Sequence, residues 1–465
     1  MHHHVPRSGE VTYRLALIGT DANSVFVEGD GPRYVLPKVV TLEGTRPAKE
    51  IQRVVRECWK SVCAVVDFCH DRAGLPLCIA EQLKQVNQNH LHKVPLSQLP
   101  ESELAGRDRE VIRAIMAGEA GERGPLSCLG WSKKAAQWIT DETGFMVLPF
   151  AIEQHNANGS FALAQFKVEN GPAFWLKATG EPNQHEFPIT GTLAKLCPRF
   201  TPRVISMRKD WNAWLMADAG DPIKEDCSPD LLGVVARSVA DLQIGTIPHI
   251  NELLSAGVAD QRIPVLQSEI SEIVVFLEEA MATQVSKKVA PLSRSRLREI
   301  GLMLEDACSR VAALDVPNTL LHNDLNRTNI LVRDHECSLI DWAEACVGIP
   351  FISLEQLLLM AGEEHAAIDQ RHISEAYKQS WMEAVDEWKM DTALALMPLL
   401  APYAHLYGRG DWVRTSHRNH PRVQSYARTL ARHMDRAATN PTLQDVLFGS
   451  RASSVQTARP RRGRR

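Results

Sequence analysis

The ten cysteines of this 465-residue chain include no Cys-x-x-Cys pair, a spacing typical of zinc sites and thiol redox motifs. They are scattered, and the densest group lies in a segment with strand-like apolar patterning: Cys58, Cys63, Cys69 and Cys78. We interpret them as buried free thiols, with a zinc site as the less favoured alternative. Scattered unpaired cysteines are typical of a reducing compartment, which predicts a cytoplasmic protein.

The sequence also has no run of about 20 apolar residues, the length that a membrane-spanning helix needs. Its richest apolar stretch, Thr392 to Leu406, is interrupted by Pro398 and Pro402. The net charge is only -4, which argues against a general nucleic-acid-binding surface. We therefore expect neither a membrane protein nor a nucleic-acid-binding protein.

The length favours two or three compact units, because domains average about 150 residues. Residues 1–10 resemble a tag or cleavage remnant, and we expect them to be disordered. Residues 446–465 end in a basic run that we also expect to be disordered, with binding of an anionic partner as the alternative.

Residues 11–124 alternate between strand-like segments and helices, which predicts a small α/β domain. A helix is expected at residues 47–62, and Asp30-Gly31 is a good hairpin turn. The Gly/Glu-rich segment that follows predicts a linker and a domain boundary at Gly124. Strands are expected at residues 13–18, 24–27, 34–40, 64–68 and 76–80.

Residues 125–220 are mainly strand-like, and residues 221–445 are mainly helical. The first part contains expected helices at residues 131–140 and 186–196, and strands at 145–154, 161–168, 173–178, 203–207 and 213–217. In the second part, apolar residues with a 3.6-residue period predict helices that include 231–243, 264–283, 294–314 and 366–388. Strands followed by helices is the order of a two-lobed kinase.

The most specific pattern is a polar loop between two short apolar strands. It runs His322-Asn323-Asp324-Leu325-Asn326-Arg327-Thr328-Asn329, and Leu339-Ile340-Asp341-Trp342 follows it. Phosphoryl transfer from a nucleotide needs a carboxylate that orients the attacking hydroxyl, and oxygen ligands that hold magnesium on the phosphates. Asp and Asn are also common turn formers, but the order and spacing of this set favour a phosphotransferase.

This pattern resembles that of the aminoglycoside phosphotransferase and choline-kinase-like family, over residues 138–433. The resemblance implies an α+β, two-lobed protein-kinase-like fold. It also implies Mg²⁺-dependent transfer of the γ-phosphate of ATP or GTP to a hydroxyl of a small molecule. In that family Asp324 would be the catalytic base, Asn329 and Asp341 would bind magnesium, and His322 would brace the loop.

The loop departs from the family pattern at several positions. Asn323, Asn326, Arg327 and Thr328 replace the family's Gly, His, Pro and Gly. Ser353 stands near the place of an Asp that secures the loop in the family. These departures motivate an alternative function, a non-catalytic kinase-like module that binds a nucleotide or a partner.

The same resemblance implies a nucleotide site in the strand-rich part. Lys177 ends an apolar strand and would contact the α- and β-phosphates, with Glu186 as its helix partner. Glu181 is the rival partner, and Lys167 is the competing lysine. Backbone N–H groups of Asn158-Gly159-Ser160 could bind phosphate, although a plain hairpin turn is the alternative. Adenine would bind near Met216 to Asp218.

Residues 11–124 resemble the Nudix fold, with Gly44, Glu50 and Glu57 near positions of its motif. Lys60 and Ser61 stand where the paired, metal-binding glutamates should be. The resemblance therefore implies a smaller α/β Nudix-like domain without hydrolase activity, placed before the kinase-like fold.

The acceptor site is expected among the helices beyond Pro229. Acidic residues there could attract a cationic substrate, although we favour a merely solvated role for them: Glu363, Glu364, Glu383, Asp386 and Glu387. Aromatic residues there could stack on a ring but fit core packing better: Trp388, Tyr403, Tyr407 and Trp412.

Overall fold

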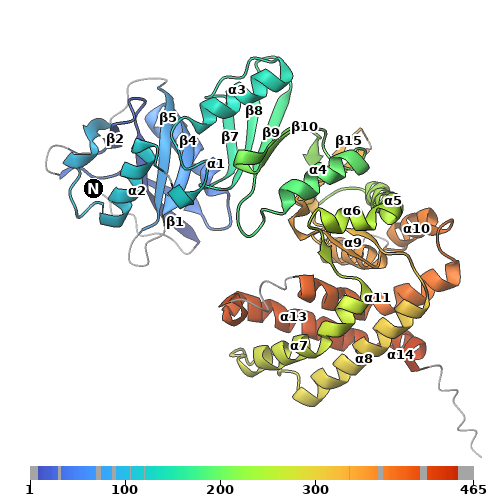
Figure 1. Ribbon diagram of the computed structural model, residues 1–465. Helices are drawn as coiled ribbons and strands as arrows, with labels where there is room; N and C mark the ends of the chain where they lie inside the picture. The colour runs from blue at the N-terminus through green and yellow to red at the C-terminus, as the bar shows by residue number, and fades with distance from the viewer. Residues whose placement is uncertain are drawn as a thin grey trace, which may run out of the picture. The chain divides into compact units, whose positions relative to one another are not determined.

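In the computed structural model the chain divides into two compact units (Figure 1). Unit 1 comprises residues 1–194 and 202–219, and unit 2 comprises residues 195–201 and 220–465. The structure describes residues 9–29, 33–69, 75–85, 91–104, 106–119, 121–334, 336–364, 370–408 and 416–448. The predicted turn Asp30-Gly31, Trp412 and the terminal segments 1–8 and 449–465 lie outside the described residues.

Unit 1 begins with a six-stranded mixed sheet of order β4-β5-β1-β2-β6, in which β3 also pairs with β1. β1 and β5 are parallel, and the other pairs are antiparallel. The strands are β1 (Glu10–Ile18), β2 (Ser24–Val27), β3 (Lys38–Leu42), β4 (Ser61–Cys69), β5 (Leu77–Gln85) and β6 (His92–Pro95).

Both faces of this sheet are buried, because strand side chains alternate between the two faces. Leu15 and Leu17 of β1 pack on one face in a cluster with Ile51 and Val55 of helix α1 (Pro47–Trp59). Ala16 and Ile18 of β1 point to the other face, into a second cluster.

The second cluster continues into a five-stranded antiparallel sheet of order β10-β11-β9-β8-β7. Phe166 and Leu176 of this sheet share it with Val66 and Leu77 of the first sheet, so the predicted boundary at Gly124 lies inside one continuous core. The strands are β7 (Ile152–Ala157), β8 (Ala162–Lys167), β9 (Ala173–Ala178), β10 (Val204–Arg208) and β11 (Ala213–Ala217). The further helices are α2 (Gly106–Ala117), α3 (Trp131–Thr143) and α4 (Glu186–Leu196).

Two buried glutamines link these sheets by hydrogen bonds. Gln154 of β7 accepts a bond from Val65 N at 2.6 Å and donates one to Val65 O at 2.9 Å, so its side chain imitates a strand partner for β4. Gln52 of α1 accepts from Gln154 N at 2.8 Å and donates to Cys63 O at 2.8 Å. The N-terminal sheet is thus built into the lobe that carries Lys177.

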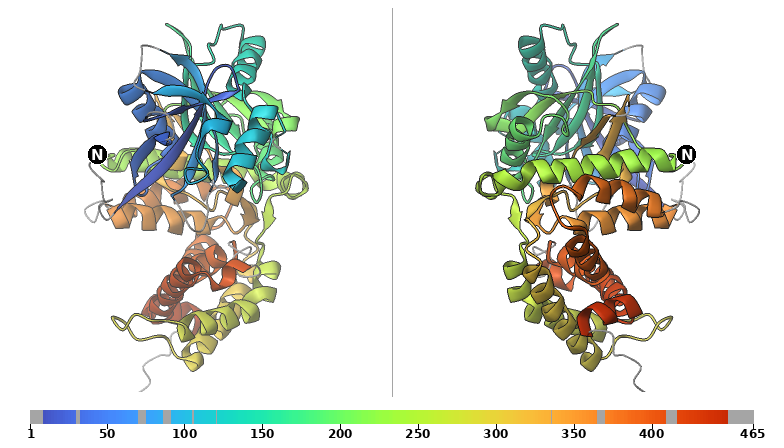
Figure 2. Two further views of the ribbon diagram at one scale, coloured as in Figure 1. Left: turned by 90° about the vertical axis from the view of Figure 1, so that its left-hand side faces the viewer. Right: turned by 90° about the vertical axis from the view of Figure 1, so that its right-hand side faces the viewer.

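Unit 2 is mainly helical, and α7, α8, α11 and α13 pack together in it (Figure 1). A second group, α5 with α10, appears in Figure 2 as two helices side by side. The helices are α5 (Pro229–Thr246), α6 (Ile250–Ser255), α7 (Ile263–Ala282), α8 (Arg294–Ala313), α9 (Phe351–Glu364), α10 (Gln370–Trp381), α11 (Glu387–Gly408), α13 (Pro421–Ala438) and α14 (Pro441–Phe448).

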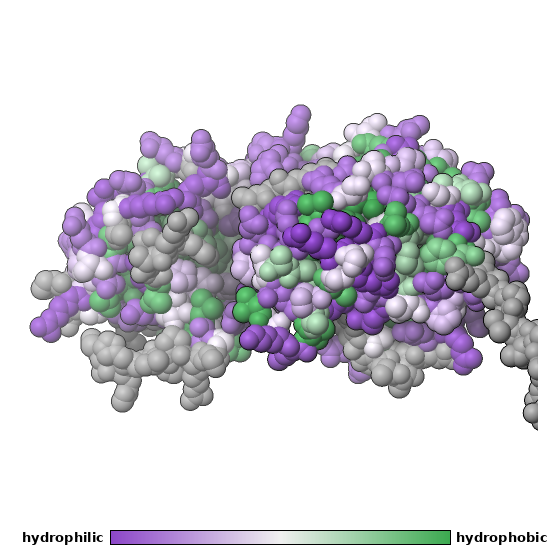
Figure 3. Space-filling model, turned by 90° about the horizontal axis from the view of Figure 1, so that it is seen from below, coloured by the Kyte–Doolittle hydropathy of each residue, from purple (hydrophilic) through white to green (hydrophobic). Residues whose placement is uncertain are grey.

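Short strands in unit 2 form two small three-stranded sheets, β12-β15-β16 and β13-β17-β14. Their bounds are β12 (Asp221–Pro222), β13 (Ala259–Asp260), β14 (Thr319–Leu321), β15 (Ile330–Arg333), β16 (Glu336–Leu339) and β17 (Cys346–Gly348). Within the described part of the chain, no helix is long and apolar enough to cross a membrane. On the face drawn in Figure 3, apolar side chains form small separate patches among hydrophilic ones.

The mixed α+β fold class is confirmed, while the likeness to the Nudix fold stays a prediction. The strand expected at residues 145–154 was placed too early, because β7 begins only at Ile152. The helix expected at residues 366–388 was wrong in extent, since α10 ends at Trp381 and α11 starts at Glu387. Pro398 and Pro402 do not interrupt α11, whose apolar side chains are buried around them.

Candidate active site

The loop 322–329 connects β14 to β15 in unit 2, and its first residue ties it to the end of β16. His322 is buried, and its Nε2 atom lies 2.8 Å from Ile340 O. Its ring packs on Trp342 with a centroid distance of 4.6 Å. His322 therefore holds the loop against the segment that carries Asp341, which is the structural role predicted for it.

Both carboxylate oxygens of Asp324 accept amide hydrogen bonds from within the loop. Asn329 Nδ2 donates to Asp324 Oδ2 at 2.9 Å and to its backbone oxygen at 3.0 Å. Asn326 Nδ2 donates to Asp324 Oδ1 at 3.1 Å. The structure thus brings two of the three predicted chemical groups, Asp324 and Asn329, into direct contact and fixes the orientation of the carboxylate.

The residues that replace the family's loop residues make side-chain bonds of their own. Asn326 caps the 3₁₀ turn Arg327–Asn329, accepting bonds from Thr328 N at 3.0 Å and Thr328 Oγ1 at 2.6 Å. The buried Arg327 donates to Lys224 O at 2.5 Å. These bonds hold the loop in place from within and from the segment that precedes α5.

Asn323, which replaces a family glycine, has a left-handed backbone with φ = 61°. Asparagine adopts this conformation more readily than other non-glycine residues, so the replacement keeps the turn. Gln356 of α9 donates to Asn323 Oδ1 at 3.2 Å and so anchors the loop from outside. No pattern in the sequence pointed to Gln356.

Ser353 does not secure the loop in the way its position suggested. Its hydroxyl accepts a bond from Gln243 Nε2 at 3.0 Å, inside a buried network that includes Tyr377 and Pro350. A serine side chain is shorter than an aspartate side chain. Here its hydroxyl belongs to the hydrogen-bond network that links α5 and α10. From α9, it is Gln356 that bonds to the loop.

The predicted magnesium ligands are joined through the backbone, because Ile340 N donates to Asn329 O at 3.0 Å. Asn329 uses its amide nitrogen on Asp324, so its Oδ1 atom is the one suited to a cation. Asp341 follows β16 with φ = 70° and is half-buried. The described residues contain no group of three or more His, Cys, Asp and Glu that could hold a metal. One amide oxygen and one or two carboxylates fit Mg²⁺, which takes its other ligands from phosphates and water.

Lys177 and Glu186 lie together in unit 1, as predicted for a phosphate-binding lysine and its partner. Lys177 Nζ lies 2.6 Å from Glu186 Oε1, and the glutamate side chain is only 1% exposed. Lys177 also lies over the ring of Trp214, its cross-strand neighbour, at 5.6 Å. The two alternative residues do not form such a buried pair: Glu181 is exposed, and Lys167 pairs with Glu153 at 3.2 Å.

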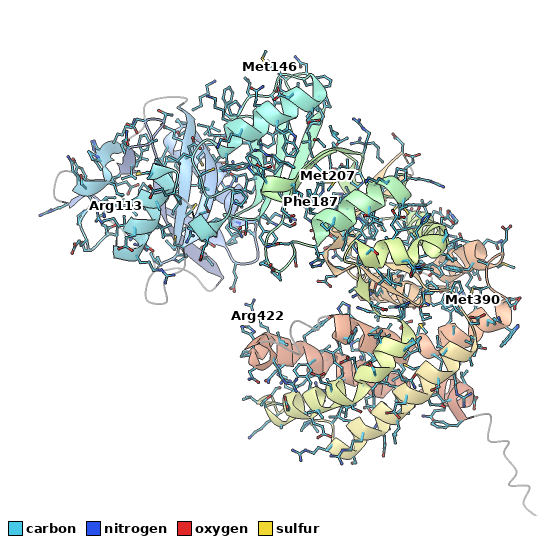
Figure 4. The ribbon with its side chains drawn as sticks, viewed as in Figure 1. Arg113, Met146, Phe187, Met207, Met390 and Arg422 are labelled. Atoms are coloured by element: carbon cyan, nitrogen blue, oxygen red, sulfur yellow. The ribbon has the colours of Figure 1, made fainter. Side chains whose placement is uncertain are left out.

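The position of Glu186 follows from how α4 packs on the sheet. Phe187 packs on Trp214 with a centroid distance of 6.5 Å. Gly191 faces the side chain of Met207, where a Cβ would lie 2.8 Å from the sulfur. Phe187 and Met207 are labelled on α4 and β10 in Figure 4. The first turn of α4 therefore lies against β11 and presents Glu186 to Lys177.

Backbone and side-chain groups of the Asn158-Gly159-Ser160 turn form hydrogen bonds within the protein. Asn158 Oδ1 accepts from Ser160 N at 2.9 Å and from Phe161 N at 2.7 Å, and Gly159 O accepts from Leu126 N at 2.8 Å. Asn158 N also donates to Phe161 O at 2.9 Å, so the N–H groups of Asn158 and Ser160, two of the three in the predicted phosphate contact, are already used. This favours the plain hairpin alternative.

The two residues expected near adenine lie at the end of β11. Met216 is buried at 8% exposure, and Asp218 Oδ1 accepts a bond from Trp175 Nε1 at 2.8 Å. The side chain of Asp218 is therefore fixed to β9, two residues before Lys177.

A pocket of ≈ 290 Å³ adjoins the catalytic loop within unit 2. Its wall includes Asn323 and Asp324 of the loop, together with residues of α9, α11 and α13. Sequence analysis expected an acceptor site among these helices but did not identify this set.

The sequence was also compared with known proteins. Residues 274–388 match the model of the phosphotransferase enzyme family (APH). No curated protein matches the sequence. Similar solved structures include a macrolide 2'-phosphotransferase from Brachybacterium faecium, with 15% identity, 68% of this chain and 97% of that chain covered, and a TM-score of 0.42.

Two further similar structures are kinases by their descriptions. A choline/ethanolamine kinase family protein from Mesorhizobium loti has 11% identity and a TM-score of 0.46, over 68% of this chain and 98% of that chain. An ethanolamine kinase from Plasmodium vivax has 12% identity and a TM-score of 0.42, over 61% of this chain and 82% of that chain. The family match confirms the resemblance expected from the loop, and Asp324, Asn329 and Asp341 lie within the matched residues.

Proposed function

We propose that this protein is a Mg²⁺-dependent small-molecule kinase that transfers the γ-phosphate of ATP or GTP to a hydroxyl of its substrate. The observation that carries the proposal is the pair of bonds from Asn329 to Asp324, on the wall of a pocket that can admit an acceptor. The match of residues 274–388 to the phosphotransferase enzyme family supports it.

In this proposal Asp324 accepts the hydrogen bond, and then the proton, of the attacking hydroxyl. Its bonds to Asn326 and Asn329 keep the carboxylate from rotating, so that an oxygen faces the acceptor. Asn329 Oδ1 and Asp341 would hold magnesium, which neutralises phosphate charge when bound. Lys177, fixed by Glu186, would contact the α- and β-phosphates.

Purified protein tests this directly with γ-labelled ATP and GTP, with and without magnesium, across a panel of hydroxylated metabolites and antibiotics. We expect label transfer that needs magnesium and is lost in Asp341→Ala. Asp334→Ala is the matched control, because Asp334 is exposed in the β15–β16 turn. Transfer that survives Asp341→Ala would contradict the proposed magnesium ligand.

The alternative is a kinase-like module that binds nucleotide without turnover. The hydroxyl of Ser353 bonds to Gln243 and not to the loop. This favours the non-catalytic alternative, because the loop then lacks the bonds that an aspartate makes to it in the family. Nucleotide that binds with magnesium but is never consumed with any acceptor would support this alternative. The ten cysteines are all free, which supports a cytoplasmic location for either function.

A further inference from the structure

The pocket beside Asp324 is built from one stripe of each of three helices. Gln356, Leu359 and Met360 lie on α9, at helical spacing. Ala401, Pro402 and His405 lie on α11, and Tyr426, Thr429, Leu430 and His433 lie on α13. Residues three, four and seven apart share a helix face, so each helix presents one continuous wall.

The charge of this wall is low. Among the described residues, Asp324 is the one carboxylate that lines the pocket. Glu383, Asp386 and Glu387, the residues considered for a cationic substrate, do not line it. The side chains of Glu363 and Glu364 lie outside the described residues.

Arg327 also lines the pocket, and Arg428 and Arg432 flank its α13 residues in the sequence. Arg327 donates to Lys224 O, as described above. On α13, Arg428 donates to Ala280 O at 2.9 Å, and Arg432 bonds to Gln284. These bonds direct the guanidinium groups of Arg428 and Arg432 to the end of α7 and the segment after it, so the pocket wall gains no fixed cation from these two residues.

Hydrogen-bonding groups alternate with apolar ones on the wall. The amides of Asn323 and Gln356 stand beside Asp324, and His405 meets Tyr426 edge to face at 5.8 Å. Leu430 and Met360 supply apolar surface, each 8% exposed. Amides, hydroxyls and an aromatic ring over apolar side chains suit a ring compound with polar edges and apolar faces.

Volume and charge together select a class of acceptor. A pocket of ≈ 290 Å³ lies at the lower end of the range of about 300–1,000 Å³ for ligand sites, so it holds one ring rather than several. An ammonium group taken from water needs a carboxylate or several hydrogen-bond acceptors, because an unpaired buried charge is costly. The only described carboxylate here, Asp324, is needed for the reacting hydroxyl.

We infer that the acceptor is a neutral, polyhydroxylated single-ring compound, and that the α9–α11–α13 pocket rejects its amine-bearing analogues. This inference rests on the proposed function for the role of Asp324, but binding to the pocket can be measured without turnover.

Matched acceptor pairs test it: glucose with glucosamine, and scyllo-inositol with streptamine, within a wider panel of neutral pentoses, hexoses and cyclitols. Thermal shift with a non-hydrolysable nucleotide reports binding, since a ligand of the folded state raises its stability. Label transfer reports turnover. We expect at least one neutral member to bind, and its amine partner to bind at least tenfold more weakly.

Thr429→Glu adds a carboxylate to the exposed part of the pocket wall, and Thr442→Glu adds one to an exposed position of α14 outside it. We expect Thr429→Glu to reduce or reverse the preference for the neutral partner, while Thr442→Glu leaves it unchanged. Equal effects of the two variants would overturn the inference.

The outcomes separate this inference from the proposed function. Binding of an amine member as tight as that of its neutral partner, or no binding by any neutral member, would overturn the inference. Neutral binding without label transfer would support the inference and contradict the proposed function. Neutral binding with transfer supports both.

Discussion

Asn329 donates its side-chain amide to Asp324 Oδ2 at 2.9 Å, and this bond assigns different tasks to the two ends of the asparagine amide. The nitrogen holds the carboxylate that we propose as the catalytic base, and the oxygen faces no such task and suits a cation. The substitution Asn329→Asp keeps an oxygen at the metal position but removes the donor.

We predict that Asn329→Asp lowers phosphoryl transfer at pH 7 by tenfold or more. Two carboxylates in contact would raise the pKa of the pair, so the acidic limb of the pH–rate profile should move to higher pH. Asn440→Asp is the control, because Asn440 Oδ1 accepts from Thr442 N at 2.9 Å and an aspartate can do the same. A pH–rate profile of Asn329→Asp that overlays the wild-type profile would argue against this division of tasks.

Substitutions in the Lys177–Glu186 ion pair should affect stability and activity differently. Lys177→Met leaves Glu186 buried without its ammonium partner, and should lower the free energy of unfolding by about 3 kcal/mol. Adding Glu186→Gln removes the buried carboxylate charge and should restore most of that stability, measured by urea unfolding. Neither variant should recover nucleotide turnover.

Lys167→Met is the control for this pair. Lys167 is exposed on the neighbouring strand and pairs with Glu153, so its loss should cost less than about 1 kcal/mol. If Lys167→Met impaired turnover as much as Lys177→Met, the assignment of the phosphate-contacting lysine would be reversed.

Local patterns predicted much of the fold and the catalytic loop. The alternation of Leu15 and Leu17 with Ala16 and Ile18 indicated a strand, which the structure confirms as one buried on both faces. The helix 186–196 and the strand 173–178 are found at the predicted bounds. Each was predicted from apolar periodicity within its own segment, which depends only on neighbouring residues.

Long-range features had no such signal. Gln52 and Gln154 are 102 residues apart, and nothing in an isolated glutamine indicates that its side chain will join two sheets. The α13 stripe of Tyr426, Thr429, Leu430 and His433 mixes polar and apolar residues, so its periodicity was not recognised as a pocket wall. The contact of Gln356 with the loop was not predicted either, because only the tertiary structure shows that Ser353 bonds to Gln243 while Gln356 bonds to Asn323.

The Gln154 link predicts that unit 1 unfolds cooperatively. Gln154→Leu leaves Val65 N–H and C=O without their side-chain partner, which should lower the free energy of unfolding by about 2–4 kcal/mol. Gln137→Leu, at an exposed position of α3, is the matched control and should change stability little. Hydrogen exchange should show faster exchange in both sheets of the Gln154→Leu variant. Faster exchange in only one sheet would show that the sheets unfold separately.

The lowered pKa of His155 predicts that the folded protein loses stability in acid. Burial lowers its pKa from 6.5 to about 4, and nearby Lys49 and Arg46 add to the effect. The unfolded chain therefore binds more protons between pH 6.5 and about 4, so stability falls as pH falls through this window. In His155→Gln, urea unfolding should show a smaller loss of stability between pH 7 and pH 5. An unchanged pH dependence would exclude His155 as its source.

Asp324→Asn tests most directly whether the fixed carboxylate of the loop carries the chemistry. The variant keeps the size of the side chain and removes the proton acceptor, and loss of a general base typically costs 10²–10⁴-fold in rate. The measurement is kcat/KM for label transfer from γ-labelled nucleotide, with Asp334→Asn as the exposed, left-handed control. A fall of about a hundredfold or more in Asp324→Asn, with Asp334→Asn unchanged, is expected. A wild-type rate in Asp324→Asn would show that another group activates the acceptor.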